Sequence, residues 1–240
     1  MTDPFRPTSP DPLPLTDRTR VGRLPSLQTR ERAALHAVLD AGLVAHVAGC
    51  IDGLPVVLPV AHARDGDRLL LHGSTGGGLL RRAAAGAPLA VAVTLLDGLV
   101  LARSLYDSSM NYRSAVVFGR ATPVPDEAKL EALRTLSARL LPGRWDEVRP
   151  PTRRELAATL VLALPLDEAS VKVSAGPPSD SDDPPPDLDV WAGVLPLRLV
   201  AGTPEPAPDA PATVPLPASL AAAAARVDAA AERVDAAAAG

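Results

Sequence analysis

The chain has 240 residues, of which 47% are hydrophobic, so it is long enough to bury a substantial core. Its formal net charge is −4 and only 2% of its residues are aromatic, which argues against a basic surface or a stacking platform for nucleic acid. Cys50 is the single cysteine, so an intrachain disulfide is excluded. The sequence shows no signal-peptide pattern and no apolar run long enough to span a bilayer, so we expect a cytoplasmic protein without membrane contact.

The two ends of the chain differ in composition from its middle. Residues 1–25 mix Pro, Asp, Thr and Arg without periodicity, which predicts a disordered arm. Residues 201–217 are rich in proline and predict a stiff linker, and residues 218–240 form an Ala-rich tail that is either helical or disordered. A seven-residue repeat in this tail fits either a weak helix–helix contact or a solvated helix. One globular domain is therefore expected over residues 26–200.

Short strands joined by tight turns dominate the predicted domain. Thr29 is expected to cap a first helix that ends at Gly42. Asp-Gly pairs at 52–53, 65–66 and 97–98 supply the positive φ angles that hairpin turns require. The expected strands are 43–50, 55–63, 68–72, 89–96, 99–104, 112–124, 160–165, 169–174 and 194–200, with further helices at 79–85 and 125–141. This pattern predicts a mainly β fold, a closed or nearly closed barrel with peripheral helices, rather than parallel βαβ winding.

A glycine-rich bend at 73–78 connects an expected strand to an expected helix. Backbone N–H groups at such a bend can surround a phosphate, and Ser74 and Arg81 would add a hydroxyl and a positive charge. A flexible strand-to-helix connection explains the same residues. Both interpretations stay open at this point.

The histidines and one polar segment are the other candidate functional residues. His36, His46, His62 and His72 have no recognised metal-ligand spacing, so no metal site is expected. His46, His62 and His72 are interpreted as core or cavity-lining residues. Haem ligation by one of them is a remaining alternative. The polar segment 109–114 either binds a ligand or completes a turn.

The order of several segments resembles the pyridoxamine 5′-phosphate oxidase-like FMN-binding split-barrel family, in the branch of flavin-nucleotide-binding proteins related to nitroimidazole reductases. The segments that carry this resemblance include DGLPVVLPV at 52–60, LLLHGSTGGGLLR at 69–81, VTLLDGLVLARS at 93–104, SMNYRSAVVFGRA at 109–121 and VWAGVLPL at 190–197. The resemblance implies a split barrel of Greek-key type. It also implies a homodimer that holds FMN at the subunit interface.

The resemblance also assigns positions to the cofactor. Along the isoalloxazine ring it places Pro59, Val60, Ala61 and His62; near the phosphate it places His72, Gly73, Ser74 and Arg81. Asn111, Arg113 and Ser114 are expected close to the cleft, and Trp191 either at the flavin edge or in packing. Relatives commonly carry a phosphate-binding lysine where this chain has Gly77-Gly78-Leu79, so Arg81 is the expected substitute. No catalytic residue is assigned.

The function implied is an FMN-dependent oxidoreductase that passes electrons from a reduced nicotinamide donor through FMN to a small-molecule substrate. Two alternatives remain: a non-catalytic FMN carrier or sensor, and a haem-binding split barrel.

Overall fold

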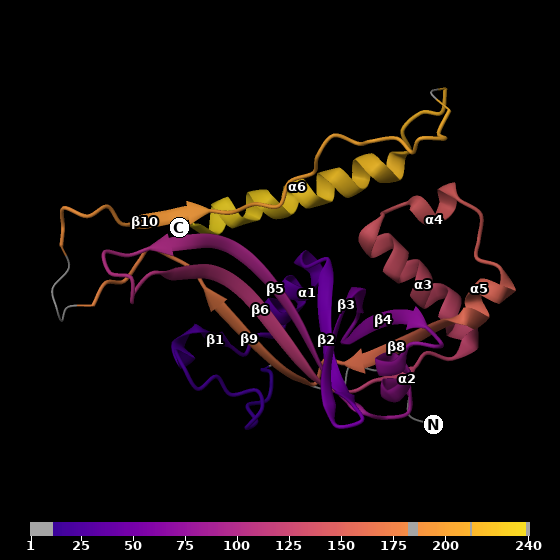
Figure 1. Ribbon diagram of the computed structural model, residues 1–240, viewed down its shortest axis with the longest axis horizontal. Helices are drawn as coiled ribbons and strands as arrows, with labels where there is room; N and C mark the ends of the chain where they lie inside the picture. Colours follow the sequence, from indigo (N-terminus) through magenta and orange to yellow (C-terminus); the bar gives the residue numbers. More distant parts are fainter. Residues whose placement is uncertain (1–11, 182–186, 212, 239–240) are drawn as a thin grey trace.

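The structure is a computed structural model that describes residues 12–181, 187–211 and 213–238 (Figure 1). Its helices are η1 (Pro25–Leu27), α1 (Arg32–Ala41), α2 (Gly78–Ala84), α3 (Asp126–Leu140), α4 (Arg144–Glu147), α5 (Arg153–Ala158) and α6 (Ala218–Ala238). Its strands are β1 (Gln28–Thr29), β2 (Val44–Ile51), β3 (Leu54–Asp65), β4 (Arg68–Ser74), β5 (Pro88–Leu101), β6 (Ser109–Arg120), β7 (Thr122–Pro123), β8 (Thr159–Pro165), β9 (Glu168–Ser174) and β10 (Gly193–Pro196). The first eleven residues of the expected arm, and residues 239–240 of the tail, lie outside the described residues.

The strands form one antiparallel sheet in the order β1-β9-β6-β5-β2-β3-β4-β8-β7, with β10 added beside β5. Strands β2, β3 and β4 are neighbours in the sheet, and the next long strand of the chain, β5, returns to lie beside β2. This spatial order, β5-β2-β3-β4, is the Greek-key arrangement. The sheet curls so that β6 meets β8, and a Cβ on Gly119 would lie 3.1 Å from Leu164 Cδ1. The predicted mainly β split barrel is confirmed.

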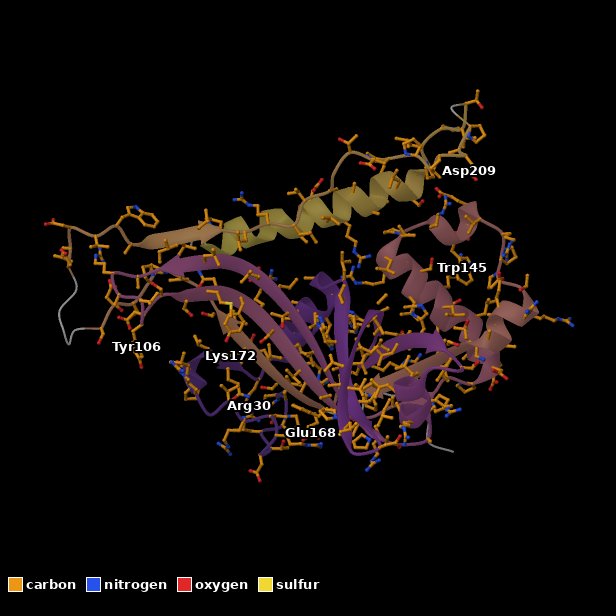
Figure 2. The ribbon with its side chains drawn as sticks, viewed as in Figure 1. Arg30, Tyr106, Trp145, Glu168, Lys172 and Asp209 are labelled. Carbon is orange, nitrogen blue, oxygen red and sulfur yellow. The ribbon has the colours of Figure 1, made fainter. Side chains whose placement is uncertain are left out.

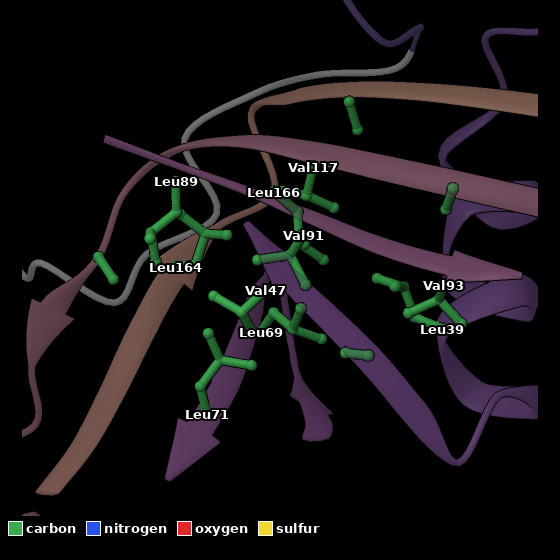
Figure 3. Packing of buried hydrophobic residues seen from close by; sticks show 14 of the residues in the cluster. Leu39, Val47, Leu69, Leu71, Leu89, Val91, Val93, Val117, Leu164 and Leu166 are labelled. Carbon is green, nitrogen blue, oxygen red and sulfur yellow. The ribbon is translucent and has the colours of Figure 1, made fainter. Parts of the chain in front are cut away.

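The core follows from the alternation of side chains along the strands. Val47, Val91 and Val117 occupy facing positions on β2, β5 and β6 and are fully buried, because their face packs against α1 and the far side of the barrel (Figure 3). A second cluster lies between the outer side of β4 and β8 and helix α3, around Leu70 and Leu136. Helix α3 therefore covers a part of the barrel that α1 does not reach.

The expected turn at Asp97-Gly98 is wrong, because β5 continues through both residues. The register between β5 and β6 shifts between Leu96 and Gly98, which makes a β-bulge instead of a hairpin. Asp97 accepts two hydrogen bonds of 2.8 Å from Arg113 on β6. A Cβ on Gly98 would lie 3.1 Å from the Leu195 carbonyl oxygen, so the glycine permits the close approach of β10.

The N-terminal region also differs from expectation. Thr29 belongs to β1, and the residue that precedes α1 is Glu31, whose N–H donates to Thr29 Oγ1 at 3.2 Å. Residues 12–25 are packed rather than disordered: Leu13 is 1% exposed, and its N–H donates to the Arg30 carbonyl at 2.8 Å. Leu13 enters the core, Thr19 is fully buried, and Arg18 pairs with Glu168, so this segment is held by a few contacts that its mainly polar composition does not predict.

Helix α6 runs alongside β10 and above β5 and β6 (Figure 1). Ser219 donates to Glu147 on α4 at 2.5 Å, and Arg226 donates to the carbonyl oxygens of Ala138 and Arg139 at 3.2 and 2.5 Å. The Ala-rich tail is thus helical where it is described, and it is attached to the barrel through α3 and α4. Among the described residues, no helix combines the length and apolarity needed to cross a membrane.

Candidate functional site

An apolar sheet face is exposed on the outside of the barrel. The registers place His46 opposite Pro59 and Ala92, and Ala92 opposite Val116, so these residues share the face that points away from the core. On the same face Val44 is 49% and Val57 60% exposed. A flat array of small and β-branched side chains suits a planar aromatic ring or a second sheet.

The structure divides the residues expected along the flavin ring between the two sides of β3. Pro59 and Ala61 lie on the outer face, where Ser114 joins them from β6. Val60 packs against the core, and His62 is fully buried, with Nε2 3.1 Å from the Leu39 carbonyl oxygen. Burial lowers the pKa of His62, against the opposing effect of its bond to Leu39. The alternation of β3 thus directs the His62 side chain away from the outer face, and the place of His62 along the flavin ring stays a prediction.

Internal hydrogen bonds occupy the amides of the glycine-rich bend. Thr75 N–H donates to the Ala158 carbonyl at 3.0 Å, Gly76 N–H to Ser74 Oγ at 3.2 Å, and Gly77 N–H to the Ser74 carbonyl at 2.9 Å. A Cβ on Gly73 would lie 2.5 Å from Leu80 Cδ1, so this glycine allows α2 to pack on β4. Ser74 and Arg81 are exposed at the two ends of the bend. Three amides of the bend are thus bonded within the chain, and the phosphate contact predicted for Ser74 and Arg81 stays a prediction.

His72 lies against a cavity of about 590 Å³ between β4 and the helices α3 to α5. Its Nδ1 is buried and has no hydrogen-bond partner, and burial lowers the pKa of the imidazole. The ring is therefore neutral at neutral pH and keeps a lone pair. The apolar walls come from Leu133, Leu136, Leu140, Leu141, Trp145 and Val148. Figure 2 shows Trp145 beside α3, where it belongs to α4.

Charged residues occur at this cavity only on the α5 side, among the residues that the structure describes. Arg149 donates to both carboxylate oxygens of Glu155, at 2.9 and 2.6 Å. These bonds, with further ones from Thr152, lower the pKa of Glu155 to about 2. Thr152 and Glu155 also form a capping box that starts α5. The cavity is thus apolar over most of its surface and carries the Arg149–Glu155 ion pair at one side.

Sequence reasoning placed His72 near a phosphate and missed this cavity, because its walls come from segments 60 to 80 positions further along the chain. The apolar residues of α3 and Trp145 can be recognised in the sequence, but the sequence does not show that they pack over β4 and His72. The LPGRW segment at 141–145 is visible in the sequence, but nothing in it indicates that Trp145 lies beside His72.

The remaining predicted residues lie elsewhere. Arg113 makes its bidentate pair with Asp97, which raises the pKa of the guanidinium, and it lines a second cavity beneath α6. Asn111 donates to the Gly176 carbonyl at 3.0 Å. Trp191 is 68% exposed, with its ring folded against Gly193. Within one chain, the predicted site residues are therefore spread over the outer face, the core side of β3, the glycine-rich bend and the two cavities, with Asn111 bonded to a loop carbonyl. The described residues contain no cluster of three or more His, Cys, Asp or Glu side chains suited to a metal ion.

Comparisons with known proteins were made for sequence and structure. A family model described as pyridoxamine 5′-phosphate oxidase matches residues 31–173. The FAD and heme binding protein of Mycobacterium smegmatis is 46% identical, and the match covers 82% of this chain and 97% of that chain with a TM-score of 0.78. The flavocytochrome Anf3 of Azotobacter vinelandii is 38% identical, with coverage of 86% and 96% and a TM-score of 0.80.

A putative 5-nitroimidazole antibiotic resistance protein of Bacteroides thetaiotaomicron shares the fold. It is 19% identical, with coverage of 61% of this chain and 86% of that chain and a TM-score of 0.51. A comparison with curated proteins gave no match.

Proposed function

The chain belongs to the pyridoxamine 5′-phosphate oxidase family, and we propose that it is an electron-transfer protein that binds a flavin on the outer sheet face and a haem in the His72 cavity. The observation that carries the haem proposal is a neutral imidazole, with one buried ring nitrogen unpartnered, at the wall of a large apolar cavity. The names of the two most identical relatives described above support the combination of flavin and haem.

The residues of the His72 cavity fit a haem. Its volume of about 590 Å³ lies within the usual range for cofactor pockets, and its leucines and Trp145 match the apolar faces of a porphyrin. A neutral histidine is the protein ligand that haem iron most often takes. Arg149 is placed to pair with a haem carboxylate, at the expense of part of its bond with Glu155. Among the described residues that line the cavity, His72 is the one histidine, so it is the residue that would hold the haem iron.

The residues of the outer face fit a flavin ring. Pro59, Ala61 and Ala92 present small side chains around an exposed surface, and Ser114 adds a hydroxyl. The sequence predicts FMN. Because the amides of the glycine-rich bend are already bonded, and because the first relative is named for FAD, we extend the proposal to FAD as the resident flavin. A second copy of the chain would cover the exposed valines of this face, which supports the expected homodimer.

When bound, the flavin supplies two-electron exchange with a reduced nicotinamide donor, and the haem supplies a one-electron centre. The work of the protein is then to bind and orient. His72 contributes an uncharged nitrogen, the apolar wall keeps water from the cavity, and the rigid β2–β3 and β5–β6 hairpins provide a fixed surface.

The absorbance spectrum of protein purified in its native state tests the proposal. We expect flavin bands together with a Soret band, and chromatography of the acid-released flavin distinguishes FAD from FMN. Light scattering on a sizing column should give twice the chain mass. Anaerobic mixing with NADPH or NADH then separates a reductase, which is reduced within the mixing experiment, from a carrier, which is not. A colourless protein that takes up neither added hemin nor added flavin would contradict the proposal.

A further inference from the structure

A second cavity, of about 250 Å³, lies beneath α6 and carries an excess of positive charge. Its lining includes the arginines Arg113, Arg139, Arg198 and Arg226 and the acids Asp40 and Asp97. Four positive and two negative charges leave a net charge of +2. The proposed function uses none of these residues.

Both acids of this cavity are already bonded to arginines. Asp97 holds Arg113, and Asp40 accepts bonds of 3.0 and 2.5 Å from Arg64, which lies outside the lining. Neither carboxylate therefore makes an ion pair with Arg139 or Arg226. Arg139 and Arg226 instead donate hydrogen bonds to backbone carbonyl oxygens, and Asp40 attracts both charges without an ion pair to either.

Arg139 is an unusual residue for such a position, because it is only 7% exposed. Its Nη2 donates to the carbonyl oxygens of Asp40 and of Gly42, the latter at 2.8 Å, and its Nε is buried without a partner. Burial, together with the nearby Arg226, lowers its pKa to about 10, so the guanidinium is still charged at neutral pH. The carboxylate of Asp40 opposes this shift from a distance but makes its ion pair with Arg64, so an anion in direct contact with Arg139 would offset part of the cost of burying its charge.

Arg226 brings the second charge from α6. Its Nη1 donates to the carbonyl oxygens of Ala138 and Arg139 at the end of α3. Val227 and Ala230 on the same helix, with leucines such as Leu43, Leu95 and Leu199, make the rest of the lining largely apolar. The cavity thus combines a cationic wall with an aliphatic one, and α6 closes it.

We propose that the cavity beneath α6 is a binding site for a small organic anion, whose acidic group binds Arg139 and Arg226 and whose short aliphatic part packs against the leucines. A volume of about 250 Å³ is below the range of drug-sized pockets, so the ligand is a short-chain acid rather than a whole nucleotide. The Ala-rich C-terminal helix then has a function, because it supplies one wall and one of the two cations.

Calorimetric titration of the full-length protein with sodium hexanoate tests this proposal. We expect hexanoate to bind, and hexanol, which has the same carbon chain without the charge, to bind at least tenfold more weakly. Arg226→Gln should weaken hexanoate by roughly tenfold or more, as expected for the loss of a charge-assisted hydrogen bond. Arg226→Lys, which keeps the charge, should recover part of the affinity. Arg139→Gln should have a similar effect, but it also removes the bonds to the end of α1.

The matched control is Arg134→Gln, which removes an exposed arginine of α3 that pairs with Asp146 outside the cavity. Equal hexanoate affinity in Arg226→Gln and Arg134→Gln, both with the melting temperature of the parent, would overturn the proposal, as would hexanol binding as tightly as hexanoate. Titration in the presence of FAD identifies the source of the acidic group. Competition by FAD would contradict a short-chain acid as the ligand and assign the two arginines to a phosphate of the dinucleotide, whereas hexanoate binding that FAD does not change supports the free acid.

Discussion

The two cavities border the same helix, and burial leaves the histidine of one neutral and the arginine of the other charged. Helix α3 presents Leu133, Leu136 and Leu140 to one cavity and Arg139 to the other. Burial lowers the pKa of both His72 and Arg139. For an imidazole this guarantees the neutral form at physiological pH, whereas a guanidinium lowered to about 10 still carries its charge. The same physical effect thus suits His72 to the proposed haem site on one side of α3 and leaves Arg139 charged for the proposed anion site on the other.

Replacing His72 should separate the two cavities most clearly. His72→Ala removes the axial nitrogen, so we expect haem affinity to fall by at least about a hundredfold, the scale of losing a metal–ligand bond. Hexanoate binding beneath α6 should be unchanged. The Soret band after hemin titration and the calorimetric heat measure the two effects. His36→Gln is the control, because His36 pairs with Asp67 away from the cavity, and retention of full haem affinity in His72→Ala would refute the assignment.

Leu136 tests whether the apolar cavity depends on tight packing around it. The side chain is 4% exposed, packs in the second core cluster and borders the His72 cavity. Leu136→Ala should lower the free energy of unfolding by about 2–5 kcal/mol, through lost burial and an enlarged void. Urea unfolding measures it, and Leu130→Ala, at a position 47% exposed on the same helix, should change stability much less. If Leu136→Ala lowered the free energy of unfolding as little as Leu130→Ala, the cavity walls would be able to rearrange around the missing side chain.

Asp97→Asn alters the charge balance in the other cavity. The substitution raises the net charge of the lining from +2 to +3 and frees Arg113, so hexanoate should bind about threefold to tenfold more tightly. Haem binding should stay unchanged. Asp52→Asn, which breaks an exposed pair with Arg82 elsewhere, is the control for general charge effects. Weaker hexanoate binding in Asp97→Asn would mean that Asp97 holds the cavity in shape rather than opposing the ligand.

The sequence predicts most strands of the barrel, since their apolar alternation and their turns are local signals. The turn at Asp52-Gly53 has positive φ at both residues, as its type requires, whereas Asp97-Gly98 carries the same letters and forms a bulge. The bulge at Asp97-Gly98 depends on Arg113 and on strand β10, which are distant from it in the sequence. Local sequence does not contain that information.

The site was less accessible to sequence reasoning than the fold. His62 and His72 both follow apolar residues in neighbouring strands, yet one enters the core and the other a cavity, because they meet different partners across the barrel. The outer face follows from alternation once the register is known, so Pro59, Ala61 and Ser114 were within reach. The α6 cavity could not be predicted, because one of its walls is a helix that a proline-rich linker connects to the barrel and whose position the sequence does not indicate.

His62 gives the smallest expected effect and tests the argument about burial without any ligand. Its folded-state pKa lies below the ordinary value of 6.5, so the unfolded chain binds the proton more readily. Stability is therefore fully present above pH 6.5 and is lost as pH falls below it, at no more than about 1.4 kcal/mol per pH unit for this group. Urea unfolding at pH 7.5 and 5.5 should show this loss, and His62→Gln should reduce it because the variant has nothing to protonate at that position. An equal loss in parent and variant would mean that His62 accepts a proton as easily in the barrel as in water, and the explanation of His72 and Arg139 by burial would lose its simplest support.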